Sequence, residues 1–164
     1  AQLGCQDFSA GGVVEAVAEK RGASVGQLTK QAEKDTTIDE EIDILVQELG
    51  IKHTKLVVDS RLGYHWITPS FKVYLDAKKS VRAHRLYENQ SEDREKTTLA
   101  EMTEMMDKRH ESKKKRYQDL YGLDIENTKP FDLVIDTSEL SEEEIVQQII
   151  EAYHTWMGKK NETK

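Results

Sequence analysis

Short apolar segments alternate with longer segments of helical period along the whole chain. Four strands are predicted: a short one around Cys5–Phe8, and three rich in Val, Ile, Leu and aromatic residues at Lys55–Asp59, Phe71–Asp76 and Phe131–Asp136. Helical spacing predicts helices over Val13–Lys20, Val25–Lys34, Ile38–Leu49, Val81–Tyr87, Thr97–Leu120 and Ser141–Trp156. Strands that alternate with helices indicate an α/β fold, with a parallel sheet and helices on both of its faces.

Two of the predicted helices carry local signals at their ends. Ser141 and Glu144 form a capping-box pattern in front of the last helix. Gly50 directly follows the helix predicted at Ile38–Leu49, where a glycine commonly adopts the left-handed conformation that ends a helix. We therefore expect the last helix to begin near Ser141 and the earlier one to end at Gly50.

Composition places the chain among globular proteins. Its 164 residues are 37% hydrophobic and 34% charged, which suits one soluble domain with a sizeable core. No apolar run approaches the roughly 18 residues that a membrane span needs. The single cysteine, Cys5, cannot form an internal disulfide, which is typical of a protein of the reducing cytoplasm.

Charge is unevenly distributed along the sequence. The net charge of −7 argues against a protein that binds long nucleic acids. The segment Lys108–Arg116 nevertheless carries +5, and the rest of the chain carries −12. Within this segment Arg109, Lys113 and Arg116 share one helical face, as cations that neutralise a small polyanion would. A solvated surface helix is the alternative interpretation.

Other candidate residues lie near the predicted ends of strands. Asp59 and Arg61 follow the second strand, at the edge of an open α/β sheet where ligands bind, and the fork of arginine donors matches phosphate. A surface Asp–Arg pair is the alternative. Arg82 and Arg85 share a face of the helix after the third strand and could flank the same cleft.

Two further features of the sequence concern a turn that a ligand could approach closely and the binding of metal ions. The small-residue turn Ser9–Gly12 follows the first strand, and such a turn lets a ligand approach the backbone closely, although it also serves as an ordinary strand-to-helix turn. The five histidines lack metal-ligand spacing and there is no cysteine cluster, so we predict no metal ligand.

Taken in order, several segments resemble the archaeal-type cytidylate kinases of the nucleoside monophosphate kinase group. The segments that carry the resemblance are Phe8–Gly11, Ala32–Asp35, Ile38–Asp43, Val58–Gly63, Arg116–Tyr117, Tyr121–Ile125 and Phe131–Thr137. They run over most of the chain, and the ordered series is more specific than any one of them.

The resemblance implies a three-layer, P-loop kinase-type fold in one domain over residues 1–164. Its parts would be a monophosphate-binding region at about 9–50, a helical lid at about 88–124, and a closing strand and helix at 125–157. It implies reversible transfer of the γ-phosphoryl group of ATP to CMP or dCMP with Mg²⁺, by a monomer or weak homodimer.

The resemblance also implies roles for individual residues. The acceptor nucleotide would be bound by Ser9, Gly11, Asp35, Asp59 and Arg61. The lid residues Arg109 and Arg116 would close on the transferring group, and Arg82 and Arg85 would bind ATP.

The sequence departs from the family pattern in two places. It contains no Gly-x-x-x-x-Gly-Lys-Ser/Thr loop, which cradles donor phosphates and places Mg²⁺, and it lacks the central strand before that loop. We expect about 15–20 residues to precede Ala1 for this reason. Glu15 stands where the family usually has an arginine, six residues after Ser9, so either Glu15 points away from the phosphate or the acceptor differs.

Two alternatives to cytidylate kinase activity stay open at this point. The chain could be a catalytically silent member that binds a nucleotide or a partner protein, which the missing loop and Glu15 favour. It could also be a kinase for another small acceptor, such as a shikimate-type substrate, because fold alone does not fix the substrate.

Overall fold

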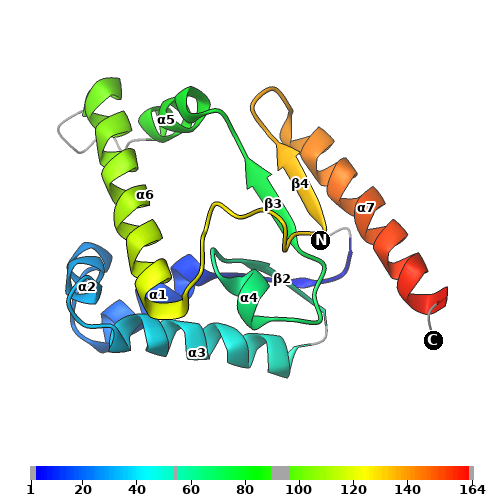
Figure 1. Cartoon of the computed structure of the whole chain (residues 1–164), viewed down its shortest axis with the longest axis horizontal. Helices are drawn as coiled ribbons and strands as arrows, with labels where there is room; N and C mark the ends of the chain where they lie inside the picture. The colour runs from blue at the N-terminus through cyan, green and yellow to red at the C-terminus, as the bar shows by residue number, and fades with distance from the viewer. Residues whose placement is uncertain (1–2, 54, 90–96, 163–164) are drawn as a thin grey trace. The chain divides into compact units, whose positions relative to one another are not determined.

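The computed structural model describes residues 3–53, 55–89 and 97–162, and its contacts group the chain into two compact units, Ala1–Ser70 and Phe71–Lys164. In Figure 1 the elements follow the order β1 (Gln6–Ser9), α1 (Ala10–Lys20), α2 (Val25–Ala32), α3 (Thr37–Lys52), β2 (Leu56–Asp59), α4 (Gly63–Trp66), β3 (Val73–Asp76), α5 (Lys79–Glu88), α6 (Leu99–Tyr121), β4 (Leu133–Asp136) and α7 (Glu142–Glu162). The predicted extent of one domain over residues 1–164 stays a prediction.

The first unit contains one pair of parallel strands and four helices. Strand β1 pairs with β2 from Gln6 opposite Leu56 to Ser9 opposite Asp59. Helices α1, α2 and α3 connect the two strands, as a parallel pair requires a long crossover. Because the strands are parallel and in this register, their carboxyl ends lie side by side.

Three helices form the core of the first unit. Val14, Val17 and Ala18 lie on one face of α1, three and four residues apart, which is the spacing that places side chains on one side of a helix. They pack with Leu28 and Ala32 of α2 and with Ile38 and Ile42 of α3. Leu28 and Ile38 are each only 1% exposed. Hydrophobic burial between α1, α2 and α3 therefore holds this unit together.

Gly50 does not end α3 as the sequence pattern predicts. The helix continues to Lys52, and the described glycines with left-handed backbone are Gly4, Gly22 and Gly122. A Cβ atom at Gly50 would lie 2.9 Å from both the Cγ1 and Cγ2 atoms of Ile67. Glycine is therefore explained here by the close approach of Ile67, which follows α4, and not by backbone conformation.

This packing makes the effect of alanine at Gly50 predictable. Gly50→Ala would gain about 1 kcal/mol of helix propensity. We expect overpacking against the branch carbons of Ile67, which costs roughly 1–3 kcal/mol, to outweigh that gain. Gly12→Ala in α1 is the control, since its Cβ would meet no atom within 4 Å. Urea unfolding measures both variants, and equal stabilisation of both would contradict the packing argument.

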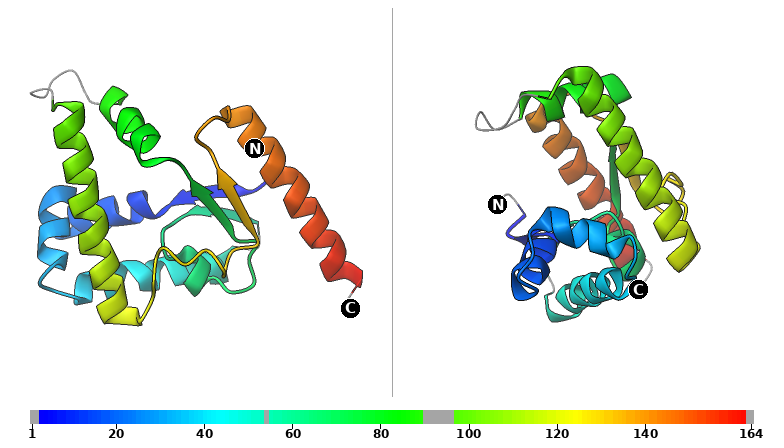
Figure 2. Two further views of the ribbon diagram at one scale, coloured as in Figure 1. Left: turned by 45° about the horizontal axis from the view of Figure 1, so that its top comes forward. Right: turned by 90° about the vertical axis from the view of Figure 1, so that its left-hand side faces the viewer.

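The second unit contains the other parallel pair. Strand β3 pairs with β4 from Val73 opposite Leu133 to Asp76 opposite Asp136. Helix α5 packs against α6, and α7 packs against β4, as the two views in Figure 2 show. Ala77, Ala83 and Ile135 are buried. Ring contacts join Phe71 to Tyr153 and Trp156 of α7, which places the aromatic residues of the last helix in the packing of this unit.

The α/β class with parallel strands and covering helices is confirmed. Within the described residues the four strands pair as two two-stranded parallel sheets, β1 with β2 and β3 with β4. The capping box before α7 is also confirmed, because the Ser141 N–H donates to Glu144 Oε2 (2.8 Å) and the Glu144 N–H donates to Ser141 Oγ (3.2 Å). Residues 90–96 of the predicted lid lie outside the described residues.

Candidate functional site

The carboxyl ends of β1 and β2 bring four of the predicted site residues together. Ser9 caps α1, and its Oγ accepts a hydrogen bond from the Gly11 N–H at 3.0 Å. Asp59 is the residue opposite Ser9, and Arg61 follows it with an exposed side chain. Ser60 turns the chain between them, because its Oγ accepts from the Gly63 N–H at 3.0 Å. This edge combines a helix N-terminus with an arginine, a combination that favours anions.

Asp35 lies away from that edge. Its carboxylate accepts hydrogen bonds from the Thr37 N–H (3.1 Å) and the Thr37 hydroxyl (2.6 Å), at the start of α3. These bonds, and to a smaller extent the charge of Arg21, lower the pKa of Asp35. Arg21, which follows the last residue of α1, forms an ion pair with Glu41 near the start of α3 (2.7 Å), and the 11 residues of α1 span about 16 Å. Asp35 and Ser9 therefore lie toward opposite ends of α1, and the structure does not bring them together.

The second unit has a hollow at the carboxyl ends of β3 and β4. It measures about 410 Å³ and is lined by Leu75, Asp76, Ala77, Arg82, Arg85, Thr137, Leu140, Glu142 and Ile145. Both predicted cofactor arginines, Arg82 and Arg85, line it, so the structure brings these two together. The wall also contains apolar side chains and two carboxylates, which the sequence patterns did not place here.

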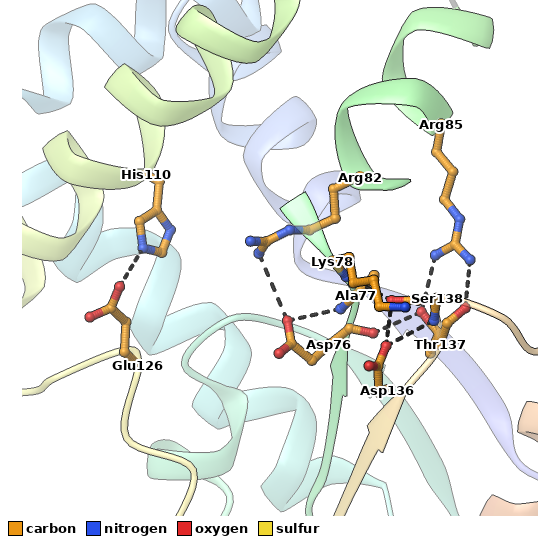
Figure 3. Close-up of polar contacts among 10 residues, drawn as sticks. All are labelled: Asp76, Ala77, Lys78, Arg82, Arg85, His110, Glu126, Asp136, Thr137 and Ser138. Carbon is orange, nitrogen blue, oxygen red and sulfur yellow. Dashed lines mark hydrogen bonds and ion pairs between the residues drawn. The ribbon is translucent and has the colours of Figure 1, made fainter. Parts of the chain in front are cut away.

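Arg85 is held by Thr137. In Figure 3 its guanidinium reaches from α5 to the residue after β4, and the two nitrogens donate to Thr137 Oγ1 (3.0 Å) and to the Thr137 carbonyl (2.7 Å). Thr137 is only 6% exposed. Its N–H and its hydroxyl both donate to the Asp76 carbonyl at 2.8 Å. Sequence reasoning missed Thr137, and its place directly after a strand that ends in aspartate was the available signal.

Arg82 has a looser contact. Its guanidinium nitrogen lies 3.9 Å from Asp76 Oδ1, and the same oxygen accepts from the Ala77 N–H at 2.8 Å. The Arg82 side chain is 47% exposed. An ion pair of this length and exposure contributes little to stability, so Arg82 can turn toward a ligand at small cost.

A second polar link joins the two loops that border the hollow. The Lys78 N–H, at the start of α5, donates to Ser138 Oγ at 2.7 Å. Asp136 in turn accepts from the Ser138 N–H and hydroxyl (Figure 3), and these bonds lower the pKa of Asp136. The loop after β3 and the loop after β4 are therefore fixed to each other.

The predicted lid arginines lie on α6, two helical turns apart. Arg109 is exposed, whereas Arg116 is partly buried and its guanidinium lies 5.6 Å from the ring centre of Tyr117. Between them His110 and Lys114 both contact the carboxylate of Glu126, which lies beyond the helix end at Gly122. Glu126 thus ties the face of α6 that carries His110 and Lys114 to the loop that follows.

This contact has a predictable pH dependence. The hydrogen bond from Lys114, and then that from His110, hold the pKa of Glu126 below its ordinary value of 4.5. A lowered folded-state pKa means that the contact stabilises the fold above the unfolded pKa and is lost as pH falls through the folded value. We expect the protection of the amides of residues 110–126 against exchange, relative to the intrinsic rate at each pH, to fall below about pH 4.5. Glu126→Gln should remove this acid step, and an unchanged step in that variant would contradict the assignment.

The described residues lack two other kinds of site. Among them no group of three or more His, Cys, Asp or Glu side chains could hold a metal ion. None of the described helices is both long enough and apolar enough to span a bilayer.

Comparison with known proteins identifies the family. The Cytidylate kinase family model matches residues 12–155. The chain belongs to the cytidylate kinase family. A cytidylate kinase from Sulfurisphaera tokodaii is 33% identical over 162 residues, 97% of this chain and 86% of that protein. One from Methanobrevibacter smithii is 32% identical over 149 residues, 91% of this chain and 84% of that protein.

A third relative is larger and has a different name. An S-adenosylmethionine-dependent nucleotide dehydratase from Lacinutrix mariniflava is 33% identical over 135 residues, which cover 82% of this chain but 27% of that protein. This chain is therefore similar to one part, about a quarter, of that longer protein.

Family membership confirms the resemblance and the class of nucleotide kinases, while the roles of individual residues stay predictions. Arg61 belongs to the first unit, and Arg109 and Arg116 belong to the second. Their action on one phosphate is therefore part of the proposal below.

Proposed function

We propose that this chain acts in the transfer of the γ-phosphoryl group of ATP to CMP or dCMP. The observation that carries the proposal is the family match over residues 12–155, together with curated cytidylate kinases that align with nearly the whole chain. The arrangement of the two sheet edges supports it, because each has cationic side chains where an α/β fold binds ligands.

The edge of the first unit suits the acceptor. Arg61 offers two parallel donors to the phosphate of CMP, and the N–H groups at the start of α1, of which that of Gly11 donates to Ser9 Oγ, lie at the same edge. Asp59, exposed at the end of β2, can accept a hydrogen bond from a nucleoside hydroxyl or amino group. We assign the acceptor nucleotide to Ser9, Gly11, Asp59 and Arg61. Asp35 is left out of this assignment, because its carboxylate already accepts two hydrogen bonds from Thr37 at the start of α3.

The hollow of the second unit suits the nucleoside part of ATP better than its phosphates. Asp76 and Glu142 offset the charges of Arg82 and Arg85, and Leu75, Leu140 and Ile145 supply apolar wall. A triphosphate in this hollow would face two carboxylates, whereas a planar base with an amino group finds apolar contact and acceptors. Arg109 and Arg116 of α6 would then neutralise the transferring phosphoryl group.

The described part of the chain does not form a magnesium site. The sequence contains no Gly-x-x-x-x-Gly-Lys-Ser/Thr segment, and the described residues contain no carboxylate cluster suited to a cation. We therefore assign no residue of this chain to Mg²⁺ and derive no step through it.

A coupled assay of ADP formation tests the proposal. We expect ADP release from ATP to depend on CMP or dCMP and to be weaker with AMP, UMP and GMP. Protein without added acceptor measures the background hydrolysis of ATP. Absence of turnover with every monophosphate would contradict the proposal, and turnover with another acceptor alone would move it to a different substrate.

A member that binds nucleotides without transfer is the second candidate. It is favoured by Glu15, a carboxylate on α1 within two turns of Ser9. Calorimetric titration with CMP and with ATP separates the two candidates. Binding without turnover supports this second candidate, and robust turnover excludes it.

A further inference from the structure

We propose that Thr137 is a positioning residue that, through Arg85, sets the shape of the hollow for the donor nucleoside. The inference rests on the proposed function and adds a residue to it. Thr137 is buried and stands directly after β4, where three elements meet: the end of β3, helix α5 and the loop that leads to α7.

All the hydrogen-bonding groups of Thr137 are used. Its N–H and its hydroxyl donate to the Asp76 carbonyl, both at 2.8 Å. Its hydroxyl oxygen and its carbonyl accept from the two terminal nitrogens of Arg85, at 3.0 and 2.7 Å. One hydroxyl thus acts as a donor to β3 and as an acceptor from α5. A side chain without a hydroxyl would leave Arg85 with one bond fewer and Asp76 with one donor fewer.

The two arginines that line the hollow therefore differ in how firmly their guanidinium groups are held. Arg85 directs both terminal nitrogens at Thr137, so its guanidinium is fixed as part of the wall. Among the residues that the structure describes, the guanidinium of Arg82 has only the 3.9 Å contact with Asp76, so Arg82 is the arginine that can turn toward a ligand. Because Thr137 accepts both hydrogen bonds that fix the guanidinium of Arg85, Thr137 determines where this part of the wall stands.

The side-chain chemistry of threonine allows a sharp test. Thr137→Val keeps the shape and removes the hydroxyl, whereas Thr137→Ser keeps the hydroxyl and removes a methyl group. Thr155→Val is the matched control, because Thr155 lies on α7 away from the hollow and its hydroxyl donates only to the Glu151 carbonyl of its own helix. Two readouts are measured for the whole chain: calorimetric affinity for ADP and for CMP, and amide exchange of the peptide that covers residues 133–141.

We expect Thr137→Val to weaken ADP binding about tenfold, with CMP binding unchanged and with faster exchange in the 133–141 peptide. Thr137→Ser should restore both ADP affinity and exchange, and Thr155→Val should change neither. If Thr137→Val does not fold, Arg85→Lys gives the same comparison, because lysine keeps the charge but cannot make the two-pronged contact.

The results that would contradict the positioning role can be distinguished from those that would contradict the proposed function. ADP binding that is unchanged in Thr137→Val, while the wild type binds ADP, overturns the positioning role and leaves the proposed function standing. Equal weakening of ADP and CMP indicates a general loss of structure and also overturns it. A wild-type chain that binds neither nucleotide overturns the proposed function and the positioning role with it.

Discussion

Arg61→Ala is expected to lower kcat/KM for CMP by about a hundredfold or more, the usual range when one donor to a reacting anion is removed. The arginine follows Asp59 at the edge where β1 and β2 end together, beside the N-terminus of α1. Arg61→Lys should recover only part of the rate, because lysine supplies the charge without the fork of parallel donors. Steady-state kinetics with CMP varied at saturating ATP measures the effect.

Lys55→Ala is the matched control for this prediction. Lys55 stands at the amino end of β2, one strand length from Arg61, and its side chain is exposed. It should leave kcat/KM within about twofold, since a screened charge at that distance contributes little. Equal losses in both variants would point to general electrostatics, and an unchanged Arg61→Ala would remove this residue from the acceptor site.

Ile38→Ala is expected to lower the free energy of unfolding of the first unit by about 2–5 kcal/mol. Ile38 is 1% exposed and belongs to the cluster that joins α1, α2 and α3, so truncation removes buried methyl groups and leaves a cavity. Guanidinium unfolding followed by circular dichroism measures the loss.

Ile44→Ala on the same helix provides the comparison. Its side chain is 54% exposed, and surface substitutions of this kind change stability by about 0.5 kcal/mol or less. The same chemical change in the same helix then reports burial alone. A large loss in Ile44→Ala would show that this face of α3 is covered in the folded protein, and a small loss in Ile38→Ala would contradict the assigned core.

The sequence was sufficient to locate every described element except the four-residue helix α4 (Gly63–Trp66), because the patterns that predict the others are local. Apolar runs that end in aspartate became β2, β3 and β4, and the capping box at Ser141 and Glu144 begins α7 as predicted. Gly50 shows the limit of such patterns. A glycine at a helix end and a glycine beneath a packed side chain look alike in sequence, and only the position of Ile67 distinguishes them.

The sequence could predict the positions of those candidate site residues that lie at the ends of strands. Ser9 and Asp59 lie opposite each other because each closes a parallel strand; the pattern gives the end of β2 at Asp59 and places the end of β1 one residue early, at Phe8. Asp35 could not be placed in this way. Its distance from Ser9 depends on how α1 packs against α2 and α3, and its hydrogen bonds to Thr37 are those of a helix cap.

By itself the sequence determined the α/β class, the order of elements, the strand ends that carry Asp59 and Asp76, and the family resemblance. Periodicity, capping and strand composition act over a few residues, so they can be read from the chain directly. Tertiary structure alone decided which strands pair, why Gly50 is a glycine, and that Thr137 holds Arg85. These outcomes depend on residues about 15 to 60 positions apart, whose contacts form only when the helices and strands pack together.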